Sequence, residues 1–314
     1  MILMPQGSGM KNYVELTYGE LQSLEKDKTV MLLSVSPIEV HGWHLPVGTD
    51  VFIAEHLLEL YAKELKMRHP DLTLVKLPPL YVGSDALPLP GSLSVDAKYL
   101  QGTLFSYGKG LAKQGFRYLF IADNHGGPRH QMAIEAAARK LWRKYKFYLI
   151  DPFNADFRKM VQHDRDLLTR TGLQPGNCGD DADSHAGTNE TSLMLAVEPN
   201  YIKENYRDSL PSKPVRKNGQ AKLVTNLATF LKRCGSKETG DDLLHLAETL
   251  AWISDPEMKP YMGDPAKATQ EAGEAMLKAR LDDALELFEK ALRGETVQLR
   301  PLLWSLRVLR KLPE

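Results

Sequence analysis

Two short apolar segments, residues 29–35 and 116–122, constrain the fold of this chain more than any other feature. Apolar runs of this length, rich in branched and aromatic side chains and closed by a polar loop, are typical of buried strands. A helical pattern of apolar residues follows each segment, at 51–68 and at 129–145. The alternation of buried strands with helices predicts a mainly parallel sheet covered by helices on both faces, which is an α/β fold.

Weaker patterns continue this alternation along the chain. The stretch 200–240 is polar and mixed, and we assign no element to it. Its basic residues are interpreted as surface: Lys213, Arg216, Lys217 and Lys222. The remaining expected elements are strands at 72–80 and 146–150, and helices at 18–28, 95–114, 154–171, 266–293 and 302–312.

The loop after the first apolar segment carries three side chains that commonly bind metals, Glu39, His41 and Asp50. Glu39 and His41 are two residues apart, so both point to the same side if the strand geometry persists. Carboxylates with an imidazole suit zinc, manganese or iron rather than a thiolate site. Each residue also has a plain structural explanation: Glu39 as a surface charge, His41 as a loop residue, and Asp50 as the cap of the next helix.

Two later loops also carry side chains that commonly bind metals. Asp123, His125, Gly126 and Gly127 follow the second apolar segment, and His185 precedes a helix that Glu190 enters. The glycines could serve only a turn, and a glutamate is favourable in any first helical turn. However, the carboxyl ends of parallel strands meet at one edge of a sheet. Two strands that each end near a histidine therefore favour a common site.

The composition excludes several classes of function. The chain has 314 residues, 43% hydrophobic and 25% charged, with a formal net charge of zero. We therefore expect no nucleic acid and no membrane partner. Two cysteines form no disulfide framework, and no segment has the features of a signal peptide or a membrane span. These observations predict a cytoplasmic protein.

Taken together, these motifs resemble the creatininase (creatinine amidohydrolase) family. The resemblance covers nearly the whole chain, because its segments occur in family order: Glu39 to Pro46 with Thr49 and Asp50, Pro90 to Ser94, His125 to Gly127, His185 to Gly187 with Glu190 to Ser192, and Gly263 to Pro265. It implies a three-layer α/β/α sandwich with a mainly parallel sheet. It also implies a single domain over 1–314, with a variable segment at 200–260, a helical part at 264–314, and a homo-oligomer, often a hexamer.

The resemblance further implies two divalent metal ions per subunit, zinc first, with manganese or iron as alternatives. Glu39, Asp50 and His125 would hold one ion, and His41 and Asp50 the other, so that Asp50 bridges. Creatininase itself completes the second site with a glutamate at the position of Gly127. The resemblance implies that relatives with His-Gly-Gly use instead the glutamate of the Glu-Thr-Ser motif. Here that residue is Glu190.

The expected reaction is hydrolysis of a C–N bond in a small amide, linear or cyclic, by a hydroxide held between the metals. His185 matches the family histidine that transfers a proton. His44, Asp123, Gly126 and Gly127 would support the ligands or contact a small-molecule substrate. Residues 152–184 lack tryptophan, whereas creatininase uses tryptophans there to enclose its substrate, so creatinine is not expected.

Four alternatives remain open. Within the family, they are a deformylase acting on a formamidopyrimidine and a hydrolase acting on the end of a modified peptide. Outside it, they are a metal-binding scaffold without activity and a phosphoesterase, which would need cationic groups near the metals. Arg129 is the candidate for such a group.

Overall fold

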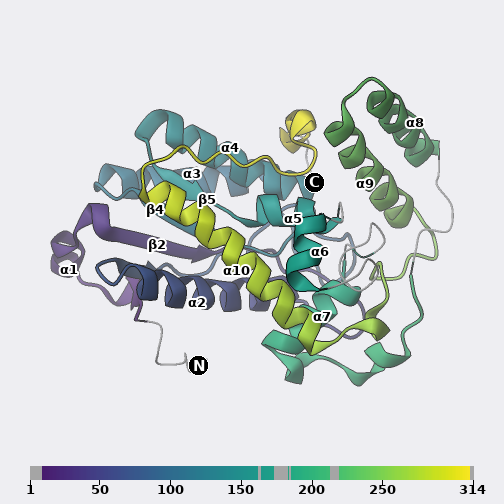
Figure 1. The fold of residues 1–314 in the computed structure, drawn as a ribbon, viewed down its shortest axis with the longest axis horizontal. Coiled ribbons are helices and arrows are strands. Elements are labelled where there is room, and N and C mark those ends of the chain that lie inside the picture. Colours follow the sequence, from purple (N-terminus) through teal and green to yellow (C-terminus); the bar gives the residue numbers. More distant parts are fainter. Residues whose placement is uncertain (1–8, 162–163, 173–182, 184, 213–218, 312–314) are drawn as a thin grey trace.

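The computed structural model describes residues 9–161, 164–172, 183, 185–212 and 219–311 (Figure 1). At its centre is a five-stranded sheet in the order β1-β3-β2-β4-β5, and every pairing is parallel. Met31 in β2 lies opposite Val75 in β3 and Leu119 in β4. The strands are β1 (Lys11–Asn12), β2 (Thr29–Ser34), β3 (Thr73–Lys76), β4 (Tyr118–Ala122) and β5 (Tyr148–Ile150).

Helices cover both faces of the sheet, which confirms the three-layer α/β/α expectation. One face packs on α2 (Thr49–Arg68) and α10 (Gln270–Leu292), and the other on α3 (Ala97–Lys113) and α4 (Pro128–Tyr145) (Figure 1). Side chains alternate along a strand, so Val30 and Leu32 join the first core while Met31 and Leu33 join the second. Because both faces are buried, β2 reads as a continuous apolar run.

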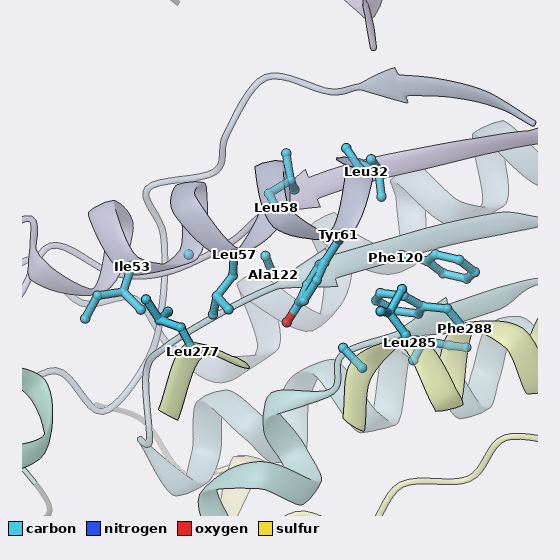
Figure 2. Close-up of a cluster of buried hydrophobic side chains, with 14 of the residues drawn as sticks. Leu32, Ile53, Leu57, Leu58, Tyr61, Phe120, Ala122, Leu277, Leu285 and Phe288 are labelled. Atoms are coloured by element: carbon cyan, nitrogen blue, oxygen red, sulfur yellow. The ribbon is translucent and has the colours of Figure 1, made fainter. Parts of the chain in front are cut away.

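Aromatic stacking joins the last long helix to the sheet. The rings of Phe120 in β4 and Phe288 in α10 are stacked, with centroids 4.1 Å apart, and Tyr61 of α2 meets Phe288 edge-on at 5.2 Å (Figure 2). These side chains are almost entirely buried. Aromatic pairs of this kind add to the stability that burial gives. The contact fixes α10 across the sheet, and α10 carries a residue that matters for the site below.

Several expected helices differ from the observed ones. The helix predicted at 18–28 ends early: α1 (Tyr18–Ser23) has a capping box from Thr17 and Glu20, and a short 3-10 turn follows at Lys26–Lys28. The helix predicted at 154–171 is two helices, α5 (Phe153–Val161) and α6 (Arg165–Thr171). The Asp164 side chain caps α6 by accepting from the N–H of Leu167, which starts a new helix there.

The C-terminal helices also differ from the prediction. Residues Pro265–Lys267 form a 3-10 turn, and α10 begins only at Gln270, because the Thr269 side chain caps it by accepting from the N–H of Ala272. The last helix is a kinked 3-10 helix, Trp304–Lys311. Helix α7 (Thr188–Val197) is present where the sequence predicts it, and two more 3-10 turns follow at Pro199–Tyr201 and Glu204–Asp208.

The stretch 200–240 holds structure that the sequence analysis did not assign. Helices α8 (Gly219–Arg233) and α9 (Lys237–Ile253) form an antiparallel hairpin beside the main body (Figure 1). Buried residues of the two helices, Ala228 and Leu243, share a small core with Leu303. Of the basic residues assigned to the surface, Lys222 is exposed, and Lys213, Arg216 and Lys217 lie outside the described residues. Among the described helices, none is long and apolar enough to cross a membrane.

Candidate metal centre

Loops at one edge of the sheet bring the predicted ligands together. Glu39 and His41 follow β2, and His125 follows β4, while Asp50 and Glu190 lie in the first turns of α2 and α7. The ligand atoms form three groups, and within each group they lie within 4.8 Å of one another. The groups are Glu39, Asp50 and His125; His41, Asp50 and Glu190; and Glu39, His41 and His185.

The His125 ring is held in one orientation. Its Nε2 lies 2.9 Å from the backbone oxygen of Ser84. A carbonyl oxygen only accepts, so this nitrogen carries the hydrogen. The other nitrogen, Nδ1, faces two carboxylate oxygens, Oε2 of Glu39 at 2.9 Å and Oδ2 of Asp50 at 3.3 Å. A neutral His125 therefore directs its lone pair at two anions.

His41 has the same arrangement with its nitrogens exchanged. Its Nδ1 donates to the backbone oxygen of Glu39 at 3.0 Å. Its Nε2 lies 3.5 Å from Oδ1 of Asp50 and 3.5 Å from Oε2 of Glu190. Among the described residues this Nε2 has no hydrogen-bond partner although it is buried, and the same is true of Oδ2 of Asp50. Buried polar atoms without partners are costly, so these two atoms fit a site that binds a further group.

The carboxylates raise the pKa of both histidines of the centre. Burial lowers the pKa of His41, but Asp50 and Glu190 beside it raise that pKa well above its ordinary value. Glu39 and Asp50 likewise outweigh burial at His125 and raise its pKa. The carboxylates thus favour positive charge beside the two imidazoles, supplied by protons or by cations. The donor set of carboxylate and imidazole fits zinc, manganese or iron.

The plain structural explanations of these residues do not match their positions. Glu39 is only 3% exposed, and its Oε1 accepts from the N–H of Leu87 at 2.5 Å, so it is not a surface charge. The cap of α2 is Gly48, and Asp50 is buried inside the first turn. The two Asp50 oxygens face different histidines, Oδ1 facing His41 and Oδ2 facing His125. This places Asp50 between the two groups.

His185 lies against the same centre on a loop that pairs with residue 262. Its Nε2 donates to the backbone oxygen of Val40 at 2.7 Å. The ring centroid is 4.3 Å from that of His41 and 5.5 Å from that of Trp252. His185 is half-buried and lines a cavity, so it can reach both the centre and a bound molecule.

His44 lies beside the centre, and none of the three ligand groups includes it. Its Nε2 is 2.9 Å from the hydroxyl oxygen of Thr191 in α7. Burial lowers the pKa of His44 to about 4, so the ring is neutral at neutral pH. The contact ties the loop of Glu39 and His41 to the helix that carries Glu190.

Asp123 and the two glycines shape the loop of His125. The Asp123 carboxylate is buried and accepts from the Ser36 hydroxyl at 2.7 Å, the His125 N–H at 3.0 Å and the Gln131 amide at 2.6 Å. A Cβ on Gly127 would lie 2.4 Å from Nε2 of His125 and 2.7 Å from the Ser84 oxygen. A glutamate therefore does not fit at Gly127. A Cβ on Gly126 would lie 2.5 Å from the ring of Phe157.

Two further residues support the candidate ligands and were not identified from the sequence, Asn124 and Arg280. The Asn124 side-chain nitrogen donates to Oδ1 of Asp50 at 2.9 Å and to Oε1 of Glu190 at 3.1 Å. Arg280 of α10, which is 3% exposed, donates to the Asn124 side-chain oxygen at 2.8 Å. The sequence does contain a signal for Arg280. It is a charged residue at helical spacing from Met276 and Ala284, so it falls on the apolar face of α10 that is expected to be buried.

A cavity of about 520 Å³ opens from this centre. Glu39, His125 and Glu190 line one end, together with His185. Apolar side chains of α5 and α9 line another part of it, and residues 85–88 and Arg129 line it as well. Trp252 of α9 is among them, so a tryptophan stands near His185 although residues 152–184 contain none.

Comparison with known proteins decides the family. A family model described as "Creatininase: Creatinine amidohydrolase" matches residues 14–288. The chain belongs to the creatininase family. The match begins before β2 and ends within α10, so it includes all the elements that carry the centre.

Individual members of the creatininase family are distant relatives. A mycofactocin precursor peptide peptidase of Mycolicibacterium smegmatis is 27% identical over 178 residues, which are 55% of this chain and 60% of that protein. The creatinine amidohydrolase of Pseudomonas putida is 26% identical over 197 residues, 60% of this chain and 72% of that one. A solved structure named "Creatininase Mn" superposes with a TM-score of 0.61 at 20% identity, covering 90% of this chain and 98% of that one. It supports the fold.

Proposed function

We propose that this protein is a dinuclear metal-dependent hydrolase that cleaves the C–N bond of an amide. The observation that carries the proposal is the position of Asp50, whose two oxygens face ring nitrogens of two different histidines. A carboxylate between two such groups is the arrangement that a pair of cations sharing one ligand requires. Membership of the creatininase family agrees with a metal-dependent hydrolase.

The ligands divide between two ions. Glu39, Asp50 and His125 would hold the first, and His41, Asp50 and Glu190 the second. Glu190 would supply the second-site carboxylate that a side chain at position 127 cannot supply, because there is no room for one at Gly127. Zinc is the first choice for both ions, with manganese or iron as alternatives, because carboxylate and imidazole ligands suit all three.

The remaining residues would bind substrate and move protons. When bound, the two cations would supply a water of lowered pKa and polarise the carbonyl of the amide. His185 lies beside the His41 ring and lines the cavity, so it can deliver a proton to the departing nitrogen. Its hydrogen bond to the Val40 oxygen fixes which ring nitrogen carries the hydrogen and leaves Nδ1 as the exchanging atom. His44, through Thr191, would hold the ligand loop in place.

A second candidate within this class is a peptide hydrolase. One relative is named a peptide peptidase, and the cavity is of the size that drug-sized ligands occupy. A peptide and a small cyclic amide present the same C–N bond to the centre. The two candidates differ in what fills the cavity beyond it. A phosphoesterase is disfavoured, because Arg129 pairs with Asp85 rather than standing free to bind a phosphate.

The decisive experiment is the metal content of the purified protein. Wild type is expected to hold about two ions per chain after loading with zinc and desalting, and Glu190→Gln about one. Glu198→Gln is the matched control, because it changes a glutamate at the end of the same helix outside the three ligand groups. No bound metal in wild type would refute the proposal.

Activity then separates an enzyme from a metal-binding scaffold. His41→Ala is expected to abolish hydrolysis of any amide that wild type cleaves, with the fold retained by circular dichroism. His185→Asn is expected to keep both metals and lose most of the rate, roughly 10²- to 10⁴-fold, as for loss of a general acid. Full metal loading with no hydrolysis of creatinine, formamidopyrimidines or short peptides would favour the scaffold.

A further inference from the structure

The cavity has two chemically different ends. Polar and charged side chains gather at the metal centre, where Glu39, His125 and Glu190 line it. The other end is formed by α5 and by the last two turns of α9. Its lining side chains include Phe153, Phe157 and Met160 of α5, and Leu246, Leu250 and Ile253 of α9. Among the described residues, no charged side chain from either helix lines the cavity.

The aromatic part of this apolar wall is held rigidly. Phe157 packs edge-on against His245 of α9, with centroids 5.8 Å apart, and stacks on Phe153 at 5.4 Å. Burial lowers the pKa of His245 to about 4, so the wall carries no charge there at neutral pH. The Trp252 indole donates to the backbone oxygen of residue 259 at 3.1 Å, which fixes its ring beside His185.

A rigid uncharged wall facing a charged centre indicates what kind of molecule fits. Water gains little from contact with such a wall, whereas an apolar group that covers the wall is removed from water and binds more tightly. A small polar ring would occupy only the charged end and leave the wall exposed to water. A ligand with an amide at one end and a hydrophobic body satisfies both ends at once.

We infer that the substrate carries a bulky apolar group, such as an aromatic or branched aliphatic side chain, next to the amide that is cleaved. The group binds between α5 and α9, and Ile253 and Leu250 select for it. The inference rests on the proposed hydrolytic function only in that it calls the bound molecule a substrate. The binding of an apolar amide at this wall can be measured without turnover.

The test compares two uncharged amides that differ in one side chain. Binding of N-acetylphenylalaninamide and N-acetylglycinamide is measured by calorimetry, on the chelated and on the zinc-loaded protein. Because each buried methylene contributes on the order of fourfold in affinity, the phenylalanine compound is expected to bind at least tenfold more tightly. Equal affinities of the two amides for wild type would overturn the inference.

A pair of matched variants places the binding at the wall. Ile253 is 40% exposed and lines the cavity, whereas Leu227 on α8 is 48% exposed and is not among its lining residues. Ile253→Asp is expected to lower the affinity for the phenylalanine compound roughly tenfold, while Ile253→Met and Leu227→Asp keep it. Equal effects of Ile253→Asp and Leu227→Asp would contradict the assigned position.

Hydrolysis separates this inference from the proposed function. If the zinc-loaded protein binds apolar amides at the wall and hydrolyses none, the wall stands and the hydrolase proposal fails. Suppose instead that kcat/KM is the same whether glycine or phenylalanine lies next to the cleaved bond, on either side of it. The hydrolase proposal is then supported, and the apolar wall has no role in substrate selection. Preferential hydrolysis of the phenylalanine series that is lost in Ile253→Asp supports both.

Discussion

The Arg280 guanidinium fixes the orientation of the Asn124 amide. It donates from Nη1 to the Asn124 side-chain oxygen at 2.8 Å and from Nη2 to the backbone oxygen of residue 123 at 2.9 Å. The amide nitrogen of Asn124 must then point at Asp50 and Glu190, two of the carboxylates assigned to the second ion. Arg280 thus acts on the centre from α10 without reaching a ligand itself.

Replacing Arg280 by methionine should therefore weaken the centre without removing a ligand. Loss of a supporting contact of this kind typically costs 10- to 100-fold in metal affinity. We expect Arg280→Met to weaken zinc binding within this range, measured by competition with a chelator. Lys278→Met, on the exposed side of the same helix, is the control and should bind zinc like wild type. Equal zinc affinity in all three proteins would show that Arg280 serves only the fold.

The space around Gly127 gives a second prediction. Gly127 has φ −54°, a value any residue adopts, so the obstacle to a side chain is contact rather than backbone conformation. Gly127→Ala should destabilise the chelated protein by about 1–3 kcal/mol, because the Cβ meets the His125 ring and the Ser84 oxygen. Gly102→Ala, in the open middle of α3, should instead stabilise by about 0.5–1 kcal/mol. Urea denaturation measures both changes, and a neutral Gly127→Ala would contradict the prediction.

Asp156 predicts an unusual dependence of stability on pH. Burial raises the pKa of Asp156 to about 7, although Arg280 lowers it, and neither carboxyl oxygen has a hydrogen-bond partner in the described part of the chain. The folded state thus binds this proton more tightly than the unfolded state does. The contribution of Asp156 to stability is fully present below about pH 4 and is lost as the pH rises through 7.

Asp156→Asn removes this titration and should stabilise the protein more at pH 8 than at pH 4. The pKa difference sets an upper limit of roughly 4 kcal/mol for that change. Urea denaturation of the chelated protein at both pH values measures it, with the exposed Asp71→Asn as control. A variant whose effect is the same at pH 4 and pH 8 would show that Asp156 does not titrate in this range.

Much of the fold, and the loops that carry the candidate ligands, could be predicted because each depends on local sequence. The apolar runs that become β2 and β4 lie directly before Glu39 and His125, and parallel strands deliver such loops to one edge. Glu190 could be chosen over Gly127 only through family resemblance. The structure adds the steric reason, since a Cβ at Gly127 has no room.

The parts that were missed depend on contacts between distant segments. Arg280 meets Asn124 across 156 residues of sequence, and no local pattern specifies that pairing. The hairpin of α8 and α9 was missed because its polar surface dominates the composition, while its small core with Leu303 forms only in three dimensions. Without α9 the apolar wall, and Trp252 beside His185, could not be anticipated.

The protons on His41 and His125 yield a last prediction. The facing carboxylates raise the pKa of both rings, and the pKa of Asp50 is held well below its ordinary value by the two histidines despite burial. We therefore expect the metal-free centre to hold protons on its imidazoles and none on Asp50 at neutral pH. A bound cation takes the place of those protons, so zinc binding must release them.

Calorimetric titration of the chelator-treated protein with zinc, in buffers of different ionisation enthalpy, counts these protons. We expect about two released per chain at pH 7 for wild type and about one for His41→Ala. Because only the deprotonated rings bind, the zinc affinity should also rise with pH through the neutral range. His56→Ala is the control, since burial lowers the pKa of His56 and its ring is neutral already. Release of no protons by wild type would mean that the imidazoles are neutral before zinc binds, and that the carboxylates do not face them as the structure places them.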